Sequence, residues 1–80
     1  MLLGQVVGNV TATRKQAALA GYKFLVIHPE GAASGAFLVA VDLMGAGVEE
    51  RVIVATGRAA RIAMGKEDLP VDAAVVGIVD

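Results

Sequence analysis

The chain has 80 residues, a formal net charge of −1 and no cysteine, so we expect one small domain over residues 1–80. Without cysteine there are no disulfides or thiolate metal sites, and one histidine cannot build a zinc site without carboxylate help. Hydrophobic residues make up 56% of the chain, above the roughly 45–50% of a soluble domain. A core of this size supplies only about 3–5 kcal/mol, so we expect partner subunits.

Charge and hydropathy exclude several classes of partner. The seven basic residues are scattered, whereas a nucleic-acid binder is expected to gather them on one face. Every apolar run is shorter than the roughly 18 residues of a membrane helix, and the N-terminus lacks the basic and apolar regions of a secretory signal. We therefore expect a cytoplasmic protein with neither nucleic acid nor membrane as its partner.

The first predicted strand covers residues 2–13, where β-branched residues alternate with others at a period of two. The inner face would consist of the six even-numbered residues from Leu2 to Ala12. Two of these, Gly4 and Gly8, are glycines, and glycine inside a strand often marks a tight bend at a barrel corner. We therefore expect this strand to be strongly curved.

Four more strands and one helix follow along the chain. The strands are predicted at Lys23–His28, Ala36–Asp42, Arg51–Thr56 and Ala73–Asp80, and the helix at Arg58–Met64. Pro29 ends the second strand because it cannot donate to a ladder, and Gly65 is a suitable helix stop. The third and fourth strands lack a polar face, as in strands buried on both sides. With no long helix available, only another subunit would cover their outer faces.

Together these elements predict an all-β protein. Five strands and one short helix in 80 residues fit a small five-stranded OB-like antiparallel barrel. Such a barrel leaves open the function of a binding module for a small ligand or single-stranded nucleic acid, which holds bases on exposed aromatics in a basic groove. The aromatics are Tyr22, Phe24 and Phe37, and we expect Phe24 and Phe37 to lie in the core.

The connection between the third and fourth strands is centred on Gly45-Ala46-Gly47. It has almost no side-chain volume, so its value lies in backbone position: a sharp corner, a close contact with another chain or the rim of an opening. Taken alone, a surface turn is the simplest interpretation. Glu49, Glu50 and Arg51 follow directly and are well placed for polar contacts.

Residues that could carry catalysis, bind a cofactor or hold a metal are not grouped in the sequence. His28 has no second histidine nearby, and Asp42, Asp72 and Asp80 stand at strand borders, where acidic residues commonly cap or turn the chain. The glycine loop lacks the Gly-Lys-Ser/Thr ending of a phosphate-binding loop. We therefore predict no catalytic, cofactor or metal site, although an enzyme subunit without a marked site stays a third alternative.

The order of residues along the whole chain resembles the EutN/CcmL family, the pentameric vertex proteins of bacterial microcompartment shells. The matching segments are Leu3–Gly8, Thr11–Lys15, Leu19–Val26, Val39–Asp42, Gly45–Val48, Ala60-Arg61 and Pro70–Asp80. The sequence departs from the family pattern at Glu49, where many members carry glycine, and at Arg58-Ala59, where many carry Ser-Ser.

The resemblance implies an OB-like barrel, a homopentamer and a non-catalytic role at the fivefold corners of a carboxysome or metabolosome shell in the cytoplasm. Hexameric shell proteins would be its neighbours. Since a cyclic ring joins two different patches, we hypothesise that one patch is the loop and the other is the exposed face of a neighbouring strand. The predicted subunit-contact residues are Gly45, Ala46, Gly47 and Val48, with Glu49, Glu50 and Arg51 as polar partners, and Ala60 and Arg61 are predicted to contact shell tiles.

Overall fold

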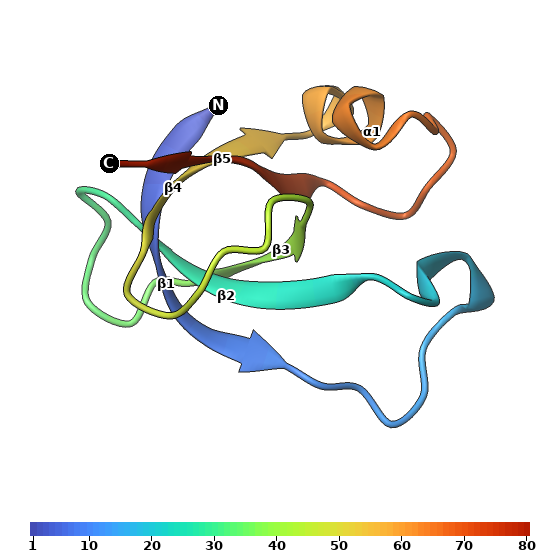
Figure 1. Cartoon of the computed structure of the whole chain (residues 1–80), viewed down its shortest axis with the longest axis horizontal. Helices are drawn as coiled ribbons and strands as arrows, with labels where there is room; N and C mark the ends of the chain where they lie inside the picture. Colours follow the sequence, from blue (N-terminus) through green and yellow to red (C-terminus); the bar gives the residue numbers. More distant parts are fainter.

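Five strands close into a barrel in this computed structural model, which describes all residues from 1 to 80 (Figure 1). The strands are β1 Leu2–Val10, β2 Lys23–Pro29, β3 Leu38–Asp42, β4 Arg51–Thr56 and β5 Ala73–Val79, and the helices are the 3-10 helix η1 Ala17–Leu19 and α1 Arg58–Met64. No helix is long and apolar enough to span a membrane. The predicted five-stranded barrel with one short α-helix is confirmed.

Strand direction differs from the prediction in one place. The order around the barrel is β1-β2-β3-β5-β4, and β3 pairs with β5 in parallel, whereas the other four pairings are antiparallel. Parallel neighbours need a long crossover, and here β4, α1 and the following loop supply it. Hydrophobic periodicity reports which face of a strand is apolar but not which way its neighbour runs, so the sequence did not reveal this pairing.

The barrel interior holds the main core. Alternate residues of the strands point inward and are almost fully buried, as a period of two requires. They are Val6, Leu25, Ile27, Ala40, Val52, Val54, Ala73 and Val75. The prediction that β3 and β4 carry apolar side chains on both faces is also confirmed, because Val41 and Ala55 on the outer faces are buried as well.

A second core lies outside the barrel, where α1 and the loop after it cover the strands. Its buried residues are Val41, Ala55, Ala60, Leu69, Val71 and Ala74. The expectation that only another subunit could cover these outer faces is therefore wrong at this end of the barrel, because a seven-residue helix and its loop are enough. Apolar residues of the outer faces that stay exposed include Leu3, Val7 and Val39.

Strand β1 is curved as predicted, but its register changes halfway. A bulge between Val6 and Gly8 inserts one extra residue against β2, and a bulge bends its strand. Beyond it Val10 pairs with Phe24, which packs against the second core outside the barrel. Since paired residues share a face, Val10 points outward. The prediction that the inner face continues to Val10 is wrong because an extra residue reverses the alternation, and Ala12 lies beyond the end of the strand at Val10.

Candidate functional site

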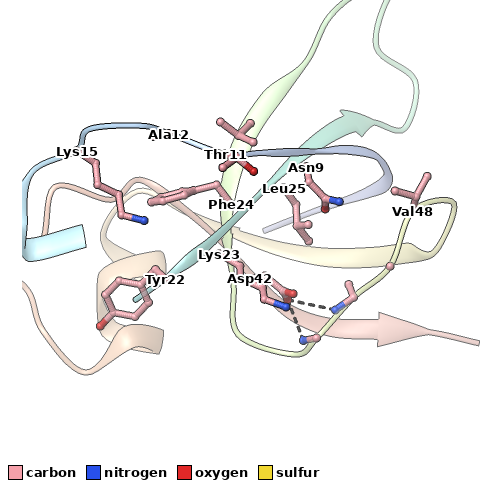
Figure 2. A pocket seen from close by; sticks show the side chains of 14 residues that line it. Asn9, Thr11, Ala12, Lys15, Tyr22, Lys23, Phe24, Leu25, Asp42 and Val48 are labelled. Atoms are coloured by element: carbon pink, nitrogen blue, oxygen red, sulfur yellow. Dashed lines mark hydrogen bonds between the residues drawn. The ribbon is translucent and has the colours of Figure 1, made fainter. Parts of the chain in front are cut away.

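The loop of residues 43–50 between β3 and β4 is held in place by Asp42. Its Oδ1 atom accepts hydrogen bonds from the backbone N–H groups of Met44, Gly45 and Ala46 at 3.0, 3.0 and 3.3 Å, two of which are drawn in Figure 2. Aspartate favours turns because its short side chain reaches the backbone just ahead. Gly45 then takes a φ of 76°, a left-handed conformation that glycine adopts without steric cost. The predicted capping role of a strand-border aspartate is confirmed at Asp42.

The far end of the loop is tied to β1 and to itself. The backbone N–H of Glu49 donates to the Val6 carbonyl at 2.8 Å, and the Val6 N–H donates to the Glu50 carbonyl at 3.0 Å. The Glu50 carboxylate accepts from the Gly47 N–H at 2.6 Å. Glu50 was predicted to meet a neighbouring subunit, but its carboxylate already has a partner in its own chain.

Arg51 also has its partner within the chain. Its guanidinium donates to both carboxylate oxygens of Glu30, with Nη2 at 3.0 Å from Oε2. The hydrogen bond from Arg51 lowers the pKa of Glu30 below its ordinary value, and Glu30 raises the pKa of Arg51 in return. Both side chains are about half exposed, so this surface ion pair contributes little to stability.

This ion pair makes a small part of the stability depend on pH. Because the pKa of Glu30 is lower in the folded state, the pair stabilises above the ordinary glutamate pKa, and the effect is lost as pH falls through the folded value. We expect Glu30→Gln to unfold at lower urea than the parent at pH 7 and at the same urea in strong acid. In an Arg51→Gln background the same substitution should change nothing, and a difference that persists in acid would contradict this account.

Glu49 is the only residue other than glycine with a positive φ, at 78°. The left-handed conformation costs about 1–2 kcal/mol for a residue with a Cβ atom. Glycine avoids this cost but loses more conformational entropy on folding, which offsets about 0.5–1 kcal/mol of the gain. We therefore expect Glu49→Gly to stabilise the protein by about 0.5–1 kcal/mol in urea unfolding. The matched control is Ala33→Gly in another exposed loop, where φ is not positive and only the entropic loss acts. Equal effects of the two substitutions would contradict the strain at Glu49.

A hollow of about 470 Å³, here called the loop hollow, opens beside this loop (Figure 2). One wall is the stretch Gly45–Val48, and the facing wall comes from Asn9–Ala12 at the end of β1. The floor is the start of β2 with Phe24, and the Lys15 ammonium lies 5.4 Å from the centre of the Phe24 ring. The loop that the sequence singled out therefore lines a surface hollow.

The two residues predicted to contact shell tiles lie on α1. Ala60 is fully buried in the second core, so its predicted surface contact is wrong, because α1 turns that face toward the barrel. Arg61 is half-buried and donates from Nη1 to the Val71 carbonyl at 3.2 Å, which holds the loop after α1 against the helix. Nothing in the periodicity of seven residues indicated which face of this helix would be covered.

The aromatic residues divide differently from the prediction. Tyr22 and Phe24 pack against the second core, but Phe37 is 57% exposed, so the expectation that it lies in the core is wrong. It stands just before β3, and its ring meets that of His28 edge to face at 5.8 Å. The acidic and histidine side chains nowhere form a group of three that could hold a metal ion.

Comparison with known proteins gives one consistent result. The family model described as "Ethanolamine utilisation protein EutN/carboxysome" matches residues 1–80. The chain is 46% identical over 84 residues to the carboxysome shell vertex protein CcmL of Thermosynechococcus vestitus, covering 100% of this chain and 84% of that protein. One similar solved structure is an ethanolamine utilization protein EutN, with a TM-score of 0.90 and 38% identity, covering 100% of this chain and 86% of that one. Another is the pentameric microcompartment shell protein GrpN from Rhodospirillum rubrum, with a TM-score of 0.83 and 43% identity, covering 100% of this chain and 93% of that one. The chain therefore belongs to the EutN/CcmL family.

Proposed function

We propose that this chain forms a homopentamer that caps the fivefold vertices of a bacterial microcompartment shell. The observation that carries the proposal is the full-length likeness to proteins named as shell vertex proteins, CcmL and GrpN, together with a solved GrpN structure named as pentameric. The role is structural, since the family is one of shell proteins rather than enzymes. The protein would act in the cytoplasm, with hexameric shell proteins as its neighbours.

The surface supports assembly through more than one side. Apolar side chains stay exposed on the strands, at the loop hollow and before β3, namely Leu3, Val7, Val10, Val39, Val48 and Phe37. Scattered apolar surface is normal, but a domain of 80 residues gains little stability from its own core, and subunit contacts would add to it. We propose the Gly45–Val48 loop as part of one contact surface.

The first test is the native mass of the purified protein, by native mass spectrometry or light scattering. We expect five times the 8.1 kDa of one chain. The vertex role is then tested by assembling the protein with hexameric shell proteins and viewing the product by electron microscopy. We expect closed polyhedra with the protein and open sheets or tubes without it. A stable monomer would overturn the proposal and favour the small binding module.

The contribution of the loop is best tested at Gly47. A Cβ atom there would lie 3.4 Å from the Glu50 Oε1 atom, an ordinary contact, and its φ is not positive, so the backbone accepts a side chain and Gly47→Leu adds bulk at the proposed contact. Gly45→Leu is a poorer test because left-handed backbone at that position penalises any side chain. We expect Gly47→Leu to shift the pentamer toward monomers, and an unchanged native mass would remove the loop from the contact surface.

A further inference from the structure

Phe37 is a large aromatic side chain that its own chain leaves 57% exposed and contacts on one side. The His28 ring supports it edge to face at 5.8 Å, and the His28 Nδ1 donates to the carbonyl of the preceding Ala36 at 3.0 Å. A side chain already fixed in position loses less freedom when a partner binds. Aromatic residues, phenylalanine included, are enriched at protein interfaces.

The chain around Phe37 presents the ring without obstruction. The connection from Gly31 to Ala36 consists of glycine, alanine and serine, and it projects at one end of the molecule (Figure 1, left). Val39, two residues beyond Phe37, is 49% exposed and lies on the same side, because alternate residues of an extended chain share a face. Residues 30–37, here called the Phe37 segment, therefore form a projection in which Phe37 is the only large apolar side chain.

The loop hollow has the chemistry that would receive such a ring. Val10, Phe24 and Val48 supply apolar lining, and Lys15 and Lys23 also line the hollow. Neither lysine forms an ion pair within the chain. An ammonium group is attracted to the face of an aromatic ring, as Lys15 already is to Phe24 at 5.4 Å. A volume of about 470 Å³ accommodates a phenyl ring with its neighbouring backbone.

The floor of the loop hollow and the Phe37 segment lie at opposite ends of β2. Strand β2 begins at the loop hollow with Lys23 and ends at the Phe37 segment with Pro29, and seven residues at 3.3 Å each span about 20 Å. A head-to-tail ring needs two different patches on each copy, and the similar GrpN structure is named as pentameric. We infer that Phe37 of each copy inserts into the loop hollow of the next copy around the ring, a contact that rests on the proposed pentamer and names its two surfaces.

The absence of native cysteine allows a direct test by disulfide trapping. Two double variants pair Phe37→Cys with one wall of the hollow, either Ala12→Cys or Val48→Cys. A disulfide needs Cα atoms about 4.4–6.8 Å apart, and only a bond that joins two copies gives linked chains, whereas a bond within one copy leaves a single chain. We expect oxidation of at least one double variant to give a covalent ladder reaching five chains on a non-reducing gel, and each single variant to give none. A pentamer in which neither pair links would overturn the inference.

A second measurement compares two matched substitutions. Phe37→Ser removes the proposed anchor, and Ile62→Ser on α1 removes an apolar side chain of nearly equal exposure, 58%, that belongs to neither surface. We expect Phe37→Ser to raise the concentration at which the pentamer dissociates at least tenfold and Ile62→Ser to leave it unchanged, with circular dichroism confirming that both fold. If the unmodified protein is not pentameric, the proposed function fails. If it is pentameric and Phe37→Ser changes nothing, only this inference fails.

Discussion

Gly4→Ala is expected to destabilise the barrel by about 2–3 kcal/mol, in the upper range for inserting a methyl group into a packed core. A Cβ atom at Gly4 would lie 2.5 Å from Ile27 Cγ2 and 3.0 Å from the backbone carbonyl oxygen of His28. The Ile27 side chain is itself fully buried and has no free space to enter, and the carbonyl belongs to the paired strand. The measurement is the urea midpoint and slope, taken at one protein concentration because assembly stabilises by mass action.

The matched control is Gly8→Ala on the same strand. A Cβ atom at Gly8 would meet nothing within 4 Å, and its φ is not positive, so the added methyl group meets no obstacle. We expect Gly8→Ala to leave stability unchanged or to raise it by a few tenths of a kcal/mol, since alanine loses less freedom than glycine on folding. Equal losses at Gly4 and Gly8 would show that close strand approach is not what requires glycine at Gly4.

Asp42→Ala is expected to cost about 2–3 kcal/mol, because the carboxylate accepts three backbone hydrogen bonds and bonds to charged groups contribute about 1.5–3 kcal/mol. Without the cap, the Gly45–Val48 wall of the loop hollow loses its fixed position. We therefore expect the variant to unfold at lower urea and to assemble less well, with both effects read from urea unfolding and native mass.

Asp42→Asn separates the acceptor from the charge. The amide oxygen of asparagine can replace Oδ1 in the same turn. We therefore expect Asp42→Asn to lower the free energy of unfolding by less than half as much as Asp42→Ala does. If Asp42→Ala unfolds at the same urea concentration as the parent protein, the three hydrogen bonds do not hold the loop. The backbone hydrogen bonds between the loop and Val6 of β1 would then be what fixes the shape of the hollow.

Local signals were enough to place most of the elements. Strand β4 and helix α1 have their predicted bounds, and β2 and β5 differ by one residue. Gly65 ends the helix in the left-handed conformation predicted for it, with a φ of 78°. Signals of this kind act within a few residues through backbone sterics and hydrogen bonding, so they can be read without knowing the rest of the fold. The family was recognised from residues in the same linear order.

The candidate site depended on contacts that no local pattern contains. The sequence predicted the loop at Gly45–Val48, but not that Glu50 and Arg51 would find partners in their own chain. It placed Phe37 in the core, where an apolar neighbourhood normally puts a phenylalanine, although the barrel closes without it. Ala60 was predicted on the surface and lies in the second core.

Sequence by itself therefore determined the order of the five strands and of α1, the curved first strand and the family. The tertiary structure decided which faces are covered, because closing the barrel adds long-range pairings to local preferences. One bulge after Val6 reverses the face of Val10, since strand faces alternate at every residue. Pairing β3 with β5 brings the outer faces of Val41 and Ala74 together under α1, and it leaves Phe37 and the loop hollow open for a second copy.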